Sequence, residues 1–220
     1  MKKIIAVVLF VFMFFMPFGP LHAEQEFRLL VFGDSLSAGY GVGKNNSFAT
    51  LLQKELHKNG YKSVQVVNRS KSGETTMGGL IRLPLLLKEI RPNGVIIELG
   101  INDVFKGNSV STIRLNLERM IKICQEHDVA VLLAGMKAPP YAGEFYQKEF
   151  NAMYEELAVK YNLVYYPFFM KGVIALEDGI PVAKYVLPDN IHPNVNGIML
   201  MVKNMLPVVE RFLKLNNVMP

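Results

Sequence analysis

The sequence has a single cysteine, Cys124, so no disulfide can form within the chain. It also lacks a strong charge imbalance, because 24 Lys and Arg against 19 Asp and Glu give a formal net charge of +5. No basic stripe is interleaved with aromatic residues, which argues against a nucleic-acid-binding protein. No His-Glu-x-x-His pattern or Cys/His cluster with zinc spacing is present. We therefore expect no metal, no cofactor, no nucleic-acid partner and no obligate protein partner.

Phosphate-binding motifs are missing as well, although glycine is frequent between residues 39 and 43. A P-loop ending at Gly43-Lys44 would need a glycine where Ala38 stands and a Ser or Thr where Asn45 stands. The spacing of glycines at 39, 41 and 43 does not fit the G-x-G-x-x-G pattern of dinucleotide-binding proteins. These mismatches exclude the common nucleotide-binding classes.

The apolar run near the N-terminus is short for a membrane span. It covers fifteen residues, 4–18, after a positively charged start, whereas a span needs about 20. A small residue, Ala23, precedes a polar stretch. This pattern predicts a signal peptide over residues 1–23, cleaved after Ala23, and a periplasmic or secreted bacterial protein, with a retained anchor as the alternative.

Beyond residue 24, short apolar runs alternate with longer amphipathic stretches. The runs are near-continuous, which is typical of parallel strands covered on both faces. They lie at residues 27–32, 63–68, 94–99, 129–134 and 163–167, and the amphipathic stretches at 47–60, 111–127, 144–161 and 194–215. This alternation predicts an α/β fold, a three-layer α/β/α sandwich with a parallel sheet, in one domain over residues 24–220.

The first apolar run ends at Gly33-Asp34-Ser35, where α/β proteins place functional loops. Ser35 can be a nucleophile, or it can cap the next helix. A nucleophile needs a base, and of the four histidines only His192 has a nearby acid in one loop, in "LPDNIHPN". There Asp189 precedes His192 by three residues, so its carboxylate can reach Nδ1 and leave Nε2 free for the Ser35 proton. A turn acid beside a histidine at a helix start is the structural alternative.

Two further strand ends carry small or amide residues. Gly73 follows the second apolar run, and Asn102 follows the third in "LGINDVF". The carboxyl ends of parallel strands meet at one edge, so we expect both beside Ser35. The N–H groups of Ser35 and Gly73 and the Asn102 amide would then form an oxyanion hole. Ordinary turn positions are the alternative for each, and Asp34 and Asp103 are interpreted as structural.

These four blocks, "FGDSLSAGYG", "SGETT", "LGINDVF" and "LPDNIHPN", resemble those of the SGNH, or GDSL, hydrolases. The resemblance spans residues 24–220 in the family's order. It is closest to the bacterial periplasmic acyl-CoA thioesterase/protease/lysophospholipase type and its arylesterase relatives. It implies a flavodoxin-like sandwich, catalysis without a metal, and a triad of Ser35, His192 and Asp189. One departure is Ile101, which stands where that subgroup has a second glycine.

The function predicted from these motifs is hydrolysis of acyl esters or thioesters through an acyl-enzyme. The substrate would be a fatty-acyl thioester, a lysophospholipid or an aryl ester. Candidate substrate-binding residues follow the third and fourth strands, unless they are ordinary loop hydrophobes: Val104, Phe105, Met136, Pro139 and Tyr141. Two alternatives remain open, a carbohydrate or peptidoglycan O-acetyl esterase and a non-catalytic periplasmic binding module.

Overall fold

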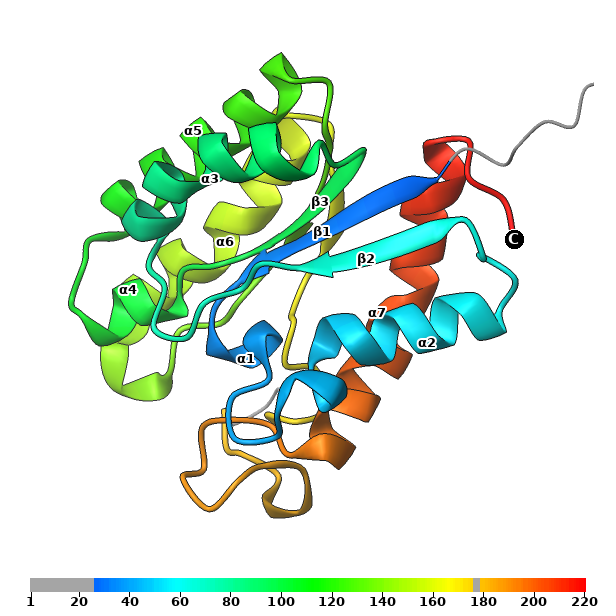
Figure 1. The fold of residues 1–220 in the computed structure, drawn as a ribbon. Coiled ribbons are helices and arrows are strands. Elements are labelled where there is room, and N and C mark those ends of the chain that lie inside the picture. Colours follow the sequence, from blue (N-terminus) through cyan, green and yellow to red (C-terminus); the bar gives the residue numbers. More distant parts are fainter. Residues whose placement is uncertain (1–25, 176–178) are drawn as a thin grey trace, which may run out of the picture.

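The computed structural model describes residues 26–175 and 179–220, which form one five-stranded parallel sheet in the order β2-β1-β3-β4-β5 (Figure 1). The predicted parallel sheet and α/β class are confirmed. The strands are β1 Phe27–Gly33, β2 Val64–Asn68, β3 Gly94–Glu98, β4 Ala130–Ala134 and β5 Val164–Tyr166. Each lies within one residue of a predicted apolar run, because strands covered on both faces need nearly every residue apolar.

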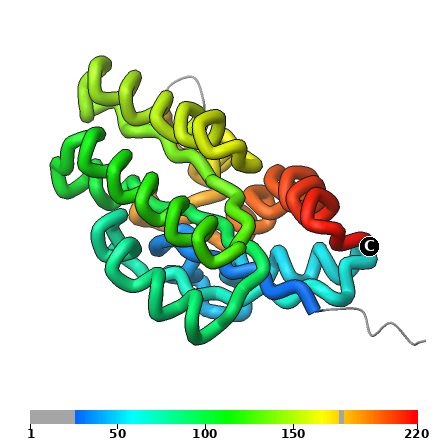
Figure 2. The backbone as a smooth tube through the Cα atoms, turned by 90° about the horizontal axis from the view of Figure 1, so that it is seen from above, coloured from blue at the N-terminus to red at the C-terminus, as the bar shows by residue number. Residues whose placement is uncertain are grey.

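Helices cover both faces of the sheet. The four longest predicted amphipathic stretches form α2 Phe48–Lys58, α5 Val110–Glu126, α6 Glu144–Lys160 and α7 Val195–Leu215. The remaining helices are α1 Ser35–Ala38, α3 Thr76–Ile90 and α4 Ile101–Phe105, and 3-10 turns lie at Lys44–Asn46, Pro140–Ala142 and Ala183–Tyr185. Figures 1 and 2 show α3, α5 and α6 on one face and α2 and α7 on the other, which gives the three expected layers.

The hydrophobic pattern of the sequence did not predict helix α3. Its first half contains Gly78 and Gly79 and its middle contains Pro84, residues that lower helix propensity. Thr75 caps it by accepting a hydrogen bond from the Gly78 N–H, and its buried face packs on α5 and β1. Gly79 lies against Leu99 and Phe32, so the missing side chain lets α3 approach the sheet. Tertiary packing therefore outweighs the weak local preference.

The core lies on both sides of β1, β3 and β4. Strand β3 is buried at all five residues, and one of them is the acid Glu98. Each fully buried Leu, Ile or Phe of such a strand stabilises the fold by roughly 1.5–3 kcal/mol relative to exposure. Cys124 is a buried core residue of α5, and burial raises the pKa of its thiol to about 12. Within the residues described, no helix has the length and apolar character to cross a membrane.

Candidate active site

Helix α1 follows the carboxyl end of β1 (Figure 1), and Ser35 is its first residue. The helix is capped by its neighbour, because Asp34 Oδ1 accepts a hydrogen bond of 2.9 Å from the Leu36 N–H. Capping by Asp34 leaves the Ser35 hydroxyl available for other contacts. The alternative interpretation, in which Ser35 itself caps the helix, is therefore wrong, because Asp34 is the capping residue.

An unbroken hydrogen-bond chain runs from Ser35 through His192 to Asp189. The His192 Nε2 atom lies 2.9 Å from Ser35 Oγ, and His192 Nδ1 lies 2.7 Å from Asp189 Oδ2. The other carboxylate oxygen, Oδ1, accepts from the backbone N–H groups of Ile191 and His192 at 2.9 and 3.0 Å. Asp189 therefore fixes both the loop and the ring of His192.

The surroundings of Asp189 keep its carboxyl group ionised beside His192. Partial burial pushes its pKa upward, but hydrogen bonds from the His192 and Ile191 N–H groups and from the imidazole lower the pKa to about 2. Tyr40, which the sequence analysis did not single out, packs its ring 4.2 Å from the His192 ring, centroid to centroid. The other described histidines bond locally: His57 to Gln53 and the Val64 carbonyl, and His127 to the Ile123 carbonyl.

Asn102 and Gly73 lie at the same edge of the sheet as Ser35. One N–H of the Asn102 amide donates to Asp34 Oδ2 at 2.9 Å, which leaves the second N–H for another acceptor. Gly73 has φ +75°, a conformation that favours glycine, and a Cβ added there would meet no atom within 4 Å. Among the described residues, no acceptor is bonded to the backbone N–H of Ser35 or Gly73. Three donors without such an acceptor thus lie at this edge of the sheet.

Ile101 adopts ordinary helical backbone angles at the start of α4. The positive φ of this turn, +131°, belongs to Gly100. A β-branched residue is therefore tolerated at position 101 without backbone strain. Asp103 is structural, as interpreted from the sequence, because it is buried and accepts from both the N–H and the hydroxyl of Thr76 at 2.8 Å. It ties the start of α3 to α4.

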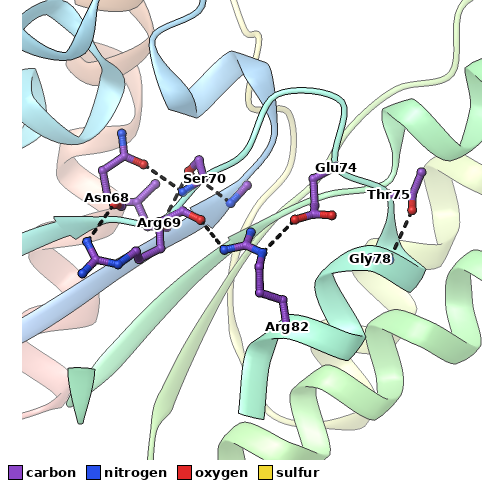
Figure 3. A network of polar contacts seen from close by, with 9 residues as sticks. Asn68, Arg69, Ser70, Glu74, Thr75, Gly78 and Arg82 are labelled. Carbon is purple, nitrogen blue, oxygen red and sulfur yellow. Dashed lines mark hydrogen bonds and ion pairs between the residues drawn. The ribbon is translucent and has the colours of Figure 1, made fainter. Parts of the chain in front are cut away.

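A polar clamp holds the loop that carries Gly73 (Figure 3). Arg82, on α3, donates from Nε to Glu74 Oε2 at 2.8 Å and from Nη1 to the Arg69 carbonyl at 2.7 Å. Arg82 thus bridges the two ends of the turn around Gly73. Gly78 faces the Glu74 carboxylate, where a Cβ would collide with it. The clamp was not predicted, because it joins residues on a loop and a helix whose packing the sequence does not reveal.

Loss of the clamp should reduce catalysis. Replacing Arg82 with methionine leaves the buried Glu74 carboxylate unpaired and frees the turn around Gly73. Because a displacement of about 1 Å can cost about 10²-fold in rate, we expect kcat to fall up to about 10²-fold with KM little changed. The control is Arg69→Met, which removes two exposed contacts, an ion pair with Glu89 and a hydrogen bond of 3.4 Å from Arg69 Nη1 to the Asn68 carbonyl. Equal losses of kcat in Arg82→Met and Arg69→Met would contradict the role assigned to the clamp.

A buried pair of acids lies beneath the serine loop. The register of β1 and β3 sets Gly33 beside Glu98, and Glu98 Oε2 accepts from the Ser37 hydroxyl at 2.7 Å and the Asp34 N–H at 3.3 Å. Burial and the neighbouring Asp34 carboxyl raise the pKa of Glu98 well above its usual range. Burial likewise raises the pKa of Asp34 to about 7, although hydrogen bonds from Leu36 and Asn102 oppose the rise.

This pair should make the folded state less stable as pH rises. In the unfolded chain both acids titrate near pH 4, whereas the folded chain retains protons on them toward neutral pH. The folded state then binds more protons than the unfolded state, so the free energy of unfolding should decline between about pH 4 and about pH 7.

The variant Glu98→Gln keeps an acceptor for Ser37 and removes one of the two titrating groups. We therefore expect a shallower pH dependence of its free energy of unfolding than in the wild type. Urea denaturation at about pH 5 and about pH 8 measures the difference. An unchanged or steeper decline in Glu98→Gln would contradict the assignment of the raised pKa values.

The candidate substrate-binding residues fall into two groups. Val104 and Met136 are buried in the core, so their side chains support the loops from within. Phe105 and Tyr141 are 49% and 75% exposed, and Pro139 is half-buried at the start of the turn Pro140–Ala142. Only the latter three are accessible to a bound molecule.

The parallel sheet, with a serine, a histidine and an acid in contact at its carboxyl edge, is the arrangement of an α/β serine ester hydrolase. Comparison with known proteins agrees with this class. Residues 31–198 match the GDSL-like Lipase/Acylhydrolase family, and the chain belongs to that family.

The relatives with curated names are esterases and thioesterases. The chain is 37% identical to "Esterase TesA" of Pseudomonas aeruginosa over 84% of its own length and 89% of the relative's. It is 36% identical to "Arylesterase" of Vibrio mimicus, over 78% and 82% of the two chains. It is 34% identical to "Thioesterase 1/protease 1/lysophospholipase L1" of Escherichia coli, over 76% and 75%.

Solved structures show the same architecture. A crystal structure of TesA has a TM-score of 0.77 and 36% identity, covering 84% of this chain and 99% of that one. A psychrotrophic esterase EstA from Pseudoalteromonas, inhibited by monoethylphosphonate, has a TM-score of 0.78 and 29% identity, covering 85% and 98%. The predicted SGNH-hydrolase fold and the serine ester hydrolase class are confirmed.

Proposed function

We propose that the protein hydrolyses acyl esters or thioesters with Ser35 as nucleophile, His192 as base and Asp189 as the acid that orients the base. The observation that carries this proposal is the continuous chain of contacts at 2.9 and 2.7 Å. Each contact lies within the reach needed for proton transfer. The ionised Asp189 holds His192 with Nδ1 protonated and Nε2 free to accept the hydroxyl proton.

The reaction proceeds in two halves. Ser35 Oγ bonds to the carbonyl carbon while its proton passes to His192 Nε2, and the carbonyl oxygen becomes an oxyanion. The tetrahedral intermediate collapses, His192 donates the proton to the leaving alcohol or thiol, and an acyl-enzyme remains. Water then attacks the acyl carbon as His192 takes a proton, and the acid is released when Ser35 recovers its proton.

The oxyanion is stabilised by the N–H groups of Ser35 and Gly73 and by the free N–H of the Asn102 amide. Each such donor can contribute about 2.7–4 kcal/mol in the transition state. The bond from Asn102 to Asp34 orients the amide before substrate arrives. The accessible side chains of Phe105, Pro139 and Tyr141 contact the acyl or aryl part of the substrate, with Val104 and Met136 behind them.

Fatty-acyl thioesters, lysophospholipids and aryl esters are the substrate classes we propose. The names of the relatives support them, since they include esterase, arylesterase, thioesterase and lysophospholipase. A panel of p-nitrophenyl esters from acetyl to palmitoyl, an acyl-CoA, a lysophospholipid and an acetylated carbohydrate tests this on the wild type and on Ser35→Ala. Turnover of acetylated carbohydrate alone would overturn the substrate assignment, and absence of any turnover would overturn the enzyme assignment.

We also propose that residues 1–23 are a signal peptide, that residues 24–220 form the mature hydrolase domain, and that it acts in the periplasm or the medium. The support is the sequence pattern, because residues 1–25 lie outside the described residues. Mass measurement of the protein recovered from cells tests this. A mature chain beginning near Glu24 is expected, whereas a retained N-terminus would overturn the proposal.

A further inference from the structure

The exposed aromatic side chains gather at the edge of the sheet that carries Ser35. Within residues 26–175 and 179–220, four aromatic residues are largely solvent-exposed: Tyr40, Phe105, Tyr141 and Phe145. They follow β1, β3 and β4, and because the strands are parallel these connections share the carboxyl edge (Figure 1). None of the exposed aromatic residues lies at the opposite edge of the described chain.

Three of the four lie on two neighbouring connections, and we call them together the aromatic rim: Phe105, Tyr141 and Phe145. They come from the connection after β3 and the connection after β4, which are tied together by the hydrogen bond from the Tyr146 hydroxyl to the Asn108 carbonyl, 2.7 Å long. The exposed fractions of the three side chains are 49%, 75% and 78%. Exposed aromatic groups of this kind beside a site often mark an interaction surface.

The charge around the aromatic rim is positive. Six exposed lysines lie on the connections that follow the five strands: Lys44, Lys71, Lys106, Lys137, Lys171 and Lys184. On the described parts of these connections, Asp34, Glu74 and Asp103 are buried, Asp189 is bonded to His192, and Glu144 is the exposed acid without such a contact. Glu177 and Asp178 of the last connection lie outside the described residues.

We propose that this edge docks on a lipid surface bearing anionic headgroups, with the aromatic rim entering the interface and the lysines at headgroup level. Aromatic residues suit the boundary between acyl chains and headgroups, and a lysine near an anionic surface contributes about 1 kcal/mol. A second copy of the chain is less suited, because it would bring lysines against lysines. Docking would deliver lipid substrates to Ser35, and this consequence rests on the proposed function. The docking itself does not depend on the proposed function.

Vesicle sedimentation tests the proposal. The variant Ser35→Ala is mixed with vesicles of phosphatidylglycerol or phosphatidylcholine, so that lipid is not consumed. We expect binding to phosphatidylglycerol, at least about tenfold weaker binding to phosphatidylcholine, and release by salt. Adding Phe145→Ser should weaken vesicle binding about tenfold, and adding Lys106→Glu should weaken it by a smaller factor. Neither change should alter the turnover of p-nitrophenyl acetate when it is made in the wild-type background.

Matched controls are Leu215→Ser and Lys62→Glu, exposed residues at the opposite edge, which should leave vesicle binding unchanged. All variants carry the same N-terminus, so differences between them do not depend on it. Absence of binding, equal and salt-insensitive binding to both lipids, or a dimer abolished by Phe145→Ser would each overturn the proposal. Binding without any ester hydrolysis by the wild type would contradict only the proposed function.

Discussion

Replacing Ser35 with alanine is expected to lower kcat by about 10⁴-fold or more while the fold is retained. The variant has no hydroxyl to bond to the acyl carbon, so no acyl-enzyme can form. Ser35 is only partly buried and its hydroxyl bonds to His192, so its removal leaves no buried polar group of the core unpaired. Ester hydrolysis assays and a thermal unfolding curve measure the two quantities.

Ser72→Ala is a suitable control for this experiment. Ser72 is exposed in the loop beside Gly73, and its substitution should leave kcat within a few-fold of the wild type. Retention of most activity in Ser35→Ala, with normal activity in Ser72→Ala, would remove Ser35 from the mechanism. Loss of the folded state in Ser35→Ala would instead indicate a structural role that the contacts do not support.

The second large effect is expected for Asp189→Asn, about 10⁴-fold in kcat. The amide oxygen can still accept from the N–H groups of Ile191 and His192, so the loop keeps its shape. Its NH₂ group cannot accept from Nδ1–H, and it favours the tautomer in which Nε2 carries the proton. His192 would then be unable to take the proton of Ser35.

A matched control is Asp128→Asn, an exposed acid at the end of α5. It should leave both kcat and KM unchanged. The free energy of unfolding of Asp189→Asn, followed by urea denaturation, should be lower than that of the wild type near neutral pH, because the lowered pKa of Asp189 means that its ionised form stabilises the folded state. Activity of Asp189→Asn within about tenfold of the wild type would show that the carboxylate is not required to orient the base.

The strands and the contacts between distant motifs could be predicted from the sequence for a physical reason. Strands buried on both faces need continuous apolar runs, and these runs are visible without knowledge of the fold. Parallel pairing then brings the carboxyl ends of all strands to one edge of the sheet. Ser35, Asn102 and Gly73 each follow such an end, so they had to lie at that edge. Asp189 and His192 are close in sequence, which made their pairing a local inference.

The residues that were missed depend on packing that no local pattern encodes. Glu98 lies within an apolar run and gives no sign that it lies beneath Asp34, because only the strand register places it there. Arg82 is one basic residue in a stretch of weak helix propensity, and its role emerges only when α3 lies beside the Gly73 loop. Tyr40 lies within the glycine-rich stretch 39–43, and the path of that stretch sets its ring against His192.

The substrate-binding candidates were harder to predict than the contacts of the serine. Loop hydrophobes have the same composition whether they face the core or the solvent. Val104 and Met136 turned inward, whereas Phe105 and Tyr141 turned outward. Only the path of each loop separates these outcomes, and glycine- and proline-rich sequences allow several paths.

Covalent labelling with an alkyl fluorophosphonate, followed by peptide mapping, addresses the nucleophile and its base together. We expect one phosphonyl group per chain, attached to Ser35, with labelling abolished in Ser35→Ala and slowed by orders of magnitude in His192→Ala. An adduct on another residue, or labelling of Ser35 at an unchanged rate in His192→Ala, would contradict the mechanism.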